Sequence, residues 1–438
     1  MKSLKLLLRF GTLGGLILLL LVPLLLIRSV IVDRTQHREE AVARVSRSSA
    51  GEQRFLGPVR YLPWSREYQV RVRDEQGAFI VENRRETGTL VQTPTRLRID
   101  GMLAPSERRI GLFKVPVYSW QAQVRAQFAP LPYAAVDGRT YGRAYLAVGI
   151  SDVRGLSGQP TLRVNGSVVN LQNDSGALAS ASPGLHAELP ALAEVAAGTL
   201  PGLAEVAMDL RLAGTRALSI VPIGDNNQIA LRSAWQHPSF GGEFLPTERQ
   251  VDASGFQAQW ALSSLATGAQ AQLLKGEALD ALRVDLIDPV DIYTQADRAS
   301  KYGLLFVLLT FTGFVLLELI RGLRIHPVQY LLVGLALAIF FLLLLSLSEH
   351  IAFWQAYLVA AAACIGLQGF YLTGVLRSRR LAVGFSTLLT ALYGVLYSLL
   401  VSEDNALLMG SLLLFGILAS IMWLTRRLDW YALGEDLR

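Results

Sequence analysis

Hydrophobic residues are concentrated near the two ends of the chain, whereas the middle alternates between apolar and polar positions. One apolar stretch covers residues 10–27, and five more follow at residues 303–320, 328–347, 353–376, 381–400 and 406–424. Each is close to the roughly 20 apolar residues that a helix needs to cross a bilayer. We therefore predict six transmembrane helices, which are an anchor over residues 10–32 and a five-helix bundle over residues 301–425.

Residues 33–300 have the pattern of an inserted all-β domain. Short alternating runs such as TRLRIDGML, YLAVGISDV and NQIALRSAW are separated by Gly, Pro, Asn and Asp. Short strands at this spacing are typical of a β-sandwich. The charged segment that opens the region is predicted to continue the first helix. The Ala-, Gly- and Leu-rich stretch 176–204 fits neither a strand nor a helix pattern well.

Arginines mark alternate connections between the predicted spans. The connections at 348–352 and 402–405 hold no Lys or Arg, whereas the remaining short connections and the segment after the last span hold Arg321, Arg324, Arg377, Arg379, Arg380, Arg426 and Arg427. Cytoplasmic connections carry the excess of Lys and Arg in membrane proteins. We therefore expect residues 1–9 and 426–438 in the cytoplasm and residues 33–300 on the opposite side of the membrane.

The net charge of +6 does not indicate a nucleic-acid-binding protein. Residues 33–300 contain 28 basic and 28 acidic residues, so the basic excess lies beside the membrane spans. There it reports membrane orientation, and we expect membrane lipids and no nucleic acid among the partners. The single cysteine, Cys364, lies in an apolar run and is expected to be a buried hydrophobic residue.

The sequence contains no motif that indicates a catalytic or metal-binding site. It lacks a phosphate-binding Gly loop, a zinc-ligand spacing and a nucleophile elbow. We therefore expect no enzymatic activity, no cofactor and no metal. Tryptophans in the β-rich region can stack on sugars or fill the core, and their strand positions favour the core: Trp64, Trp120, Trp235 and Trp260.

Two short connections between predicted spans carry the strongest candidate site. Glu349 and His350 lie in one, and Glu403 and Asp404 lie in the other. Both are predicted on the same side of the membrane, so we expect the four residues to form one polar cluster at the outer boundary, in contact with the base of the β domain. Further partners of the carboxylates are expected from bilayer-side strands or from the segment around Arg34 and Arg38. The alternative is that they are independent, solvated turn residues.

Several long segments resemble the CreD family of bacterial inner-membrane proteins. They include IHPVQYLLVGLALAIFFLLLLSLSEHIAFWQAY and LYGVLYSLLVSEDNALL near the C-terminus, and SAWQHPSFGGEFLP in the β-rich region. The resemblance implies an inner-membrane location with a periplasmic domain, and a role in cell-envelope integrity under envelope and β-lactam stress. It also implies an association with colicin tolerance. It implies no reaction and no active site.

Two functional hypotheses follow. In the first, the protein supports the envelope without catalysis, and its periplasmic domain binds an envelope glycan, lipid or partner protein. In the second, the C-terminal bundle is a transporter or flippase-like carrier. A carrier needs polar groups inside its spans, and the best candidates there are Gln368 and Tyr371. No charged residue lies in the middle of a predicted span, which favours the first hypothesis.

Overall fold

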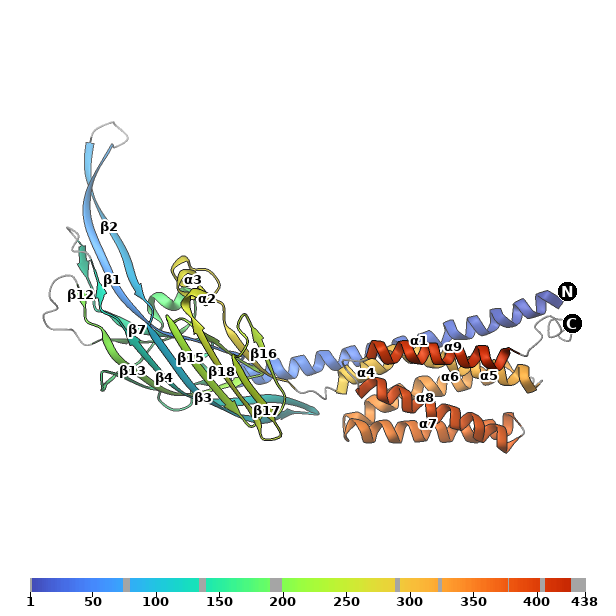
Figure 1. Cartoon of the computed structure of the whole chain (residues 1–438). Coiled ribbons are helices and arrows are strands. Elements are labelled where there is room, and N and C mark those ends of the chain that lie inside the picture. The colour runs from blue at the N-terminus through green and yellow to red at the C-terminus, as the bar shows by residue number, and fades with distance from the viewer. Residues whose placement is uncertain are drawn as a thin grey trace. The chain divides into compact units, whose positions relative to one another are not determined.

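A computed structural model describes residues 2–426 apart from 74–78, 134–138, 190–198, 288–291, 322–324, 377 and 402–405. For residues 2–10, 180, 319–321, 406, 407, 421, 424 and 425 only the backbone is described. The chain forms two compact units (Figure 1). A helical unit comprises Met1–Arg38 and Val290–Arg438, and a β-rich unit comprises Glu39–Pro289. These boundaries lie inside the expected 33–300 range.

The helical unit is built from long apolar helices. They are α1 (Lys2–Ser48), α4 (Ile292–Lys301), α5 (Gly303–Arg321), α6 (Pro327–Ser348), α7 (Phe353–Val375), α8 (Arg379–Val401) and α9 (Ala406–Thr425). The last residues of α1 belong to the β-rich unit, since that unit begins at Glu39. The charged segment after the first apolar stretch is therefore helical as far as Ser48, as predicted.

Four helices among the described residues are long and apolar enough to cross a membrane, namely α1 from Gly11, α6, α7 and α8. A fifth span exists if α4 and α5 count together, because they pass the same test as a pair but are bent by 42°. The apolar part of α9 that the test covers is Leu408–Ser420, which is short for a span. Several transmembrane helices are thus present, and the number six stays a prediction.

The β-rich unit contains a nine-stranded and an eight-stranded sheet, both mixed. Along the nine-stranded sheet the order is β10 (Gln172–Asn173), β11 (Gly184–Glu188), β7 (Tyr145–Ile150), β1 (Gln53–Arg73), β14 (Ala217–Val221), β19 (Leu282–Leu286) and β16 (Pro238–Gly242), with β2 (Phe79–Gln92) and β6 (Arg139–Tyr141) also pairing with β1. Strands β1 and β14 are parallel, and the other pairs in this sheet are antiparallel.

The eight-stranded sheet carries the face that concerns function. Its order is β17 (Glu248–Asp252), β18 (Gly255–Ser263), β15 (Asn226–Ser233), β3 (Arg96–Ile110), β4 (Phe113–Phe128), β13 (Leu203–Thr215), β8 (Thr161–Val164) and β9 (Ser167–Val169). Strands β15 and β3 are parallel. Smaller elements are η1 (Val153–Gly155), η2 (Gly176–Ser180), α2 (Ser264–Thr267), α3 (Ala269–Lys275) and the pair β12 (Thr199–Leu200) with β5 (Leu131–Pro132). The stretch 176–204, which fitted no pattern, thus holds η2, β11 and β12 around undescribed residues.

One hydrophobic core lies between the two large sheets. Phe55 of the nine-stranded sheet meets Trp120 of the eight-stranded sheet edge to face, with ring centroids 5.4 Å apart. Trp120 and Trp260 are fully buried there, so the prediction that these two tryptophans fill the core is confirmed. Trp64 and Trp235 are only partly buried. Alternate residues of each strand enter this core, which leaves the opposite residues of the eight-stranded sheet on its outer face.

Candidate functional site

The outer face of the eight-stranded sheet is polar and partly hollow. Residues of β4 alternate strictly between buried and exposed from Gln121 to Phe128, with the glutamines and Arg125 on the exposed side. Because β3, β4, β13 and β15 are neighbours, their outward residues form a continuous surface. Gln123 pairs across the strands with Asp100 on one side and Asp209 on the other. Side chains far apart in the sequence are thus brought together.

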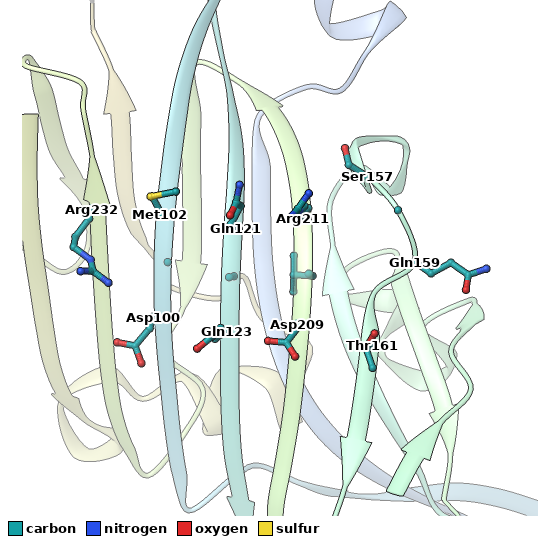
Figure 2. Close-up of a pocket in the computed structure, with 14 residues that line it drawn as sticks. Asp100, Met102, Gln121, Gln123, Ser157, Gln159, Thr161, Asp209, Arg211 and Arg232 are labelled. Carbon is teal, nitrogen blue, oxygen red and sulfur yellow. The ribbon is translucent and has the colours of Figure 1, made fainter. Parts of the chain in front are cut away.

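A central depression of about 590 Å³ lies on this face (Figure 2). Its floor is formed by β15, β3, β4 and β13, and the segment around Gly158 borders it beside β8. Amide, carboxylate and guanidinium groups predominate in its lining. The polar residues that line it are Asp100, Gln121, Gln123, Ser157, Gln159, Thr161, Asp209, Arg211 and Arg232.

A second depression of about 720 Å³, which we call the arginine depression, lies further along the same strands. Its polar residues are Arg96, Arg98, Arg125, Gln127, Glu205, Asn226 and Gln228. Arg98 donates from Nε to Asp100 Oδ2 at 2.9 Å, and this hydrogen bond raises the pKa of Arg98. Arg163 and Asp209 form a comparable ion pair at 3.4 Å. The carboxylates of the central depression therefore neutralise two neighbouring arginines.

The arrangement suits binding of a polar ligand by many hydrogen bonds. Glutamine amides both donate and accept, and arginine donates through a planar fork. The residues that line the two depressions include no His, Cys, Lys or Tyr. Across the residues that the structure describes, no three His, Cys, Asp or Glu side chains are grouped as metal ligands.

Sequence reasoning missed this face, although the alternation within one of its strands was visible. The run WQAQVRAQF places Gln and Arg at every second position of one strand. That period predicts which residues share a face of a strand. It does not predict that β3, β13 and β15 lie beside β4, so the surface was not recognisable from the sequence.

Glu349, which the sequence predicted as a site residue, lies at the end of α6 within the helical unit. Its side chain is only 6% exposed and lies 3.6 Å from the guanidinium of Arg34 on α1. Tyr293 on α4 donates its hydroxyl to the same carboxylate at 3.2 Å. Three helices thus meet at this carboxylate, and Arg34 belongs to one of the segments that the sequence suggested as a source of partners.

His350 takes a different partner. Its Nδ1 lies 3.0 Å from the carbonyl oxygen of Ser346 in the preceding turn of α6. Glu403 and Asp404 lie outside the described residues, so a single cluster of all four side chains stays a prediction.

The two polar residues predicted within the spans differ in burial. Gln368 on α7 is 1% exposed, and neither its amide nitrogen nor its amide oxygen has a hydrogen-bond partner among the described residues. Tyr371 on the same helix is half-buried. A further buried polar residue, Glu318 of α5, accepts hydrogen bonds from the hydroxyl of Tyr330 at 3.0 Å and from the backbone of Ile325 at 3.2 Å. It fastens α5 to α6.

Comparison with known proteins identifies the family. A sequence profile described as "Inner membrane protein CreD" matches residues 5–431. The inner membrane protein CreD of Escherichia coli (strain K12) is 36% identical over 431 residues, which cover 97% of this chain and 93% of that protein. A solved M1 zinc metallopeptidase from Deinococcus radiodurans has 9% identity and a TM-score of 0.20, covers 48% of this chain and 52% of its own length, and supports no conclusion. The resemblance noted in the sequence is confirmed, and the chain belongs to the CreD family of inner membrane proteins.

Proposed function

We propose that this protein supports cell-envelope integrity during envelope and β-lactam stress, without catalysing a reaction, by binding an envelope component or a partner protein. The observation that carries the proposal is the polar outer face of the eight-stranded sheet, with two depressions on adjacent strands. Binding residues on the strands of a sheet are held in fixed positions, and the hydrophobic core packs against the inner face of this sheet.

The proposal includes a membrane topology. Six transmembrane helices place both termini in the cytoplasm and the β-rich unit in the periplasm. The distribution of arginines among the short connections supports this orientation, because arginine-bearing connections alternate with connections that have none.

The chemistry of the sheet face supports binding over catalysis. General acid–base catalysis uses groups that change protonation near neutral pH, most often histidine. Neither depression contains a histidine, and the two aspartates of the central depression, Asp100 and Asp209, are both ion-paired with arginines. Carboxylates held in this way serve as fixed hydrogen-bond acceptors.

Photocrosslinking in intact cells tests the proposal. A photoreactive amino acid at Gln123, in the centre of the face, is expected to capture an envelope glycan or a periplasmic protein. The matched control replaces Gln69, an exposed glutamine on the projecting part of β1 outside both depressions. Equal capture at both positions contradicts the proposal. Unchanged stress tolerance after Gln121 and Gln123 are both replaced by Ala also contradicts it.

A second candidate function, a carrier that uses the helical unit, is favoured by the buried polar groups of that unit. Besides Gln368, the hydroxyls of Thr310 on α5 and Tyr393 on α8 are buried without a hydrogen-bond partner among the described residues. Unsatisfied polar groups at membrane depth are costly and often mark a pathway. If the bundle is a carrier, Gln368→Leu abolishes stress tolerance while the protein remains folded. If Gln368→Leu raises thermal stability and preserves tolerance, the carrier is rejected.

A further inference from the structure

Three arginines are gathered at one end of the outer face in an arrangement that is unfavourable for folding. Arg98 of β3 and Arg125 of β4 are directly opposite each other in the antiparallel register, and Arg96 is the next outward residue of β3. Side chains in such pairs leave the sheet about 5 Å apart, and like charges there destabilise the sheet. A fold that keeps a local conflict of this kind often does so for function.

Neighbouring carboxylates compensate only one of these three positive charges. Asp100 pairs with Arg98, and Asp209 pairs with Arg163 on the far side of β13. Arg125 lies between these two pairs, since its register partners are Arg98 and Ala207. Among the described residues Arg125 has no carboxylate within ion-pair distance. Glu205 also lines the arginine depression, and it forms no ion pair with a described residue.

We propose that the arginine depression binds the acidic groups of an anionic envelope glycan. Arg125 and Arg96 form no ion pair among the described residues, and Arg98 lies opposite Arg125. A guanidinium binds a carboxylate or phosphate through two parallel hydrogen bonds. The amides of Gln127 and Gln228 line the same depression and match sugar hydroxyls. This inference rests on the proposed function, because it assigns a ligand class to the face that the proposal places in the periplasm.

The extent and polarity of the face favour a glycan chain over a membrane surface. From Arg96 to Met102 the strand advances about 20 Å, which exceeds the size of a single anion and suits an extended polymer. Proteins that bind a lipid surface insert apolar side chains into it. Along both depressions the only large hydrophobic side chain that is well exposed among the described residues is Met102, at 49%.

Binding by the purified full chain in nanodiscs of phosphatidylcholine tests the inference. The probe is a fluorescent tetrasaccharide of alternating N-acetylglucosamine and N-acetylmuramic acid, which carries carboxylates, and the neutral probe is an N-acetylglucosamine tetramer. We expect preference for the acidic probe, weakening as salt increases. Arg125→Gln should weaken its binding about tenfold or more, since charge-assisted hydrogen bonds are lost. Arg125→Lys should retain part of the affinity because it keeps the charge.

The control variant is Arg85→Gln, which removes the same charge from the exposed part of β2. A second readout separates binding from a structural role. Because Arg125→Gln relieves the repulsion with Arg98, its melting temperature should equal or exceed that of the parent protein while its affinity falls.

Equal binding of the acidic and neutral probes, or equal effects of Arg125→Gln and Arg85→Gln, overturns the inference. Arg125-dependent binding to phosphatidylglycerol vesicles without binding to the acidic tetrasaccharide also overturns it, because the anion then comes from a lipid. The nanodisc exposes both sides of the membrane, so this result is independent of topology. Failure of the proposed function is detected separately, by crosslinking in intact cells.

Discussion

Trp120 and Trp260 occupy the same core but satisfy their indole N–H groups differently. Trp260 donates from Nε1 to the carbonyl oxygen of Phe244 at 3.1 Å. The Nε1 of Trp120 is buried without a partner among the described residues. Gly101 lies against this nitrogen so closely that a Cβ atom there would approach it to 2.3 Å. The indole of Trp120 therefore contributes to the core by packing and not by a hydrogen bond.

Replacing each tryptophan by Phe should separate these contributions. Both variants lose packing, but only Trp260→Phe also loses a hydrogen bond, so we expect it to lower the free energy of unfolding by about 1 kcal/mol more than Trp120→Phe. Urea unfolding of the full chain in detergent, monitored by near-ultraviolet circular dichroism, measures the difference. A larger loss for Trp120→Phe contradicts this account of the two indoles.

Arg60 is a charged residue whose burial could not be predicted from the sequence. It lies in a part of β1, residues 55–62, in which every residue is buried, and it is only 1% exposed. Burial lowers its pKa to about 10. It therefore remains charged at neutral pH. Its guanidinium donates to Gln92, to the carbonyl oxygen of Ala129 at 2.9 Å and to that of Pro201 at 2.8 Å. These acceptors come from distant segments, so the sequence gives no sign that this arginine is buried.

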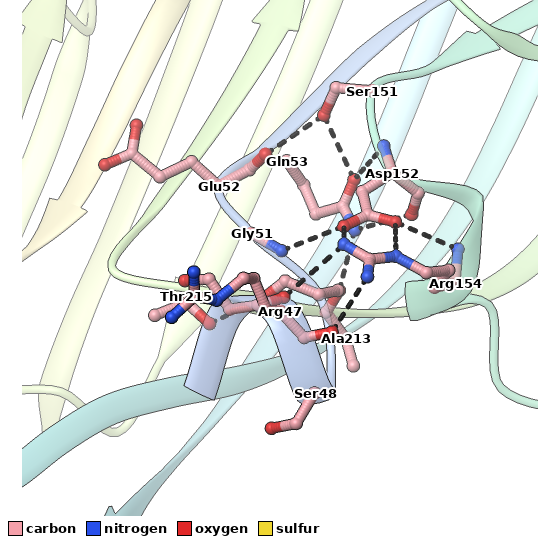
Figure 3. Close-up of polar contacts among 12 residues, drawn as sticks. Arg47, Ser48, Gly51, Glu52, Gln53, Ser151, Asp152, Arg154, Ala213 and Thr215 are labelled. Atoms are coloured by element: carbon pink, nitrogen blue, oxygen red, sulfur yellow. Dashed lines mark hydrogen bonds and ion pairs between the residues drawn. The ribbon is translucent and has the colours of Figure 1, made fainter. Parts of the chain in front are cut away.

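At the scale of elements, the end of α1 is fastened within the β-rich unit by a polar network (Figure 3). Arg154 donates to the carbonyl oxygen of Arg47 at 2.8 Å, which occupies one of the acceptors left open at the end of a helix. Asp152 holds Arg154 through an ion pair at 2.7 Å and accepts from the backbone of Gly51 at 3.1 Å. The hydrogen bond with Arg154 is the main cause of the lowered pKa of Asp152.

This network predicts a pH-dependent stability. The folded pKa of Asp152 lies below the unfolded value of about 3.9, so its contribution is complete above that value and is lost as pH falls through the folded pKa. Asp152→Asn should be less stable than the parent at pH 7, and the difference should shrink at pH 3. Thermal unfolding of both proteins at the two pH values measures it. An unchanged difference at pH 3 means that the carboxylate charge is not the cause.

Two polar segments that flank the β-rich unit in the sequence are connected to the apolar helices by ion pairs. Residues 33–38 and 290–300 are polar in character and were assigned to the soluble region. In the structure they belong to the helical unit. Arg34 reaches Glu349 of α6, and Arg28 of α1 lies 3.6 Å from Asp297 of α4. These ion pairs join segments that are far apart in the sequence, and of the two only the pairing of Arg34 was expected from the sequence.

At the scale of the whole molecule, the proposed topology predicts the accessibility of two serines. In a Cys364→Ala background, Ser167→Cys on β9 should react with a membrane-impermeant maleimide once the outer membrane is permeabilised. Ser378→Cys, between α7 and α8, should react only after the inner membrane is disrupted. Both replacements are nearly isosteric, so each serves as the control for the other. The reverse pattern of labelling rules out the proposed orientation.

The sequence by itself determined that the chain has transmembrane helices and a β-rich region, because apolar length and strand alternation are properties of contiguous residues. It also determined the family, because motifs such as IHPVQYLLVG consist of contiguous residues and can be recognised directly in the sequence. Tertiary structure alone decided that Arg98 faces Arg125, that Gln123 lies between Asp100 and Asp209, and that Tyr293 meets Glu349. Strand order and helix packing depend on contacts between distant segments, whose free energies the local pattern does not contain.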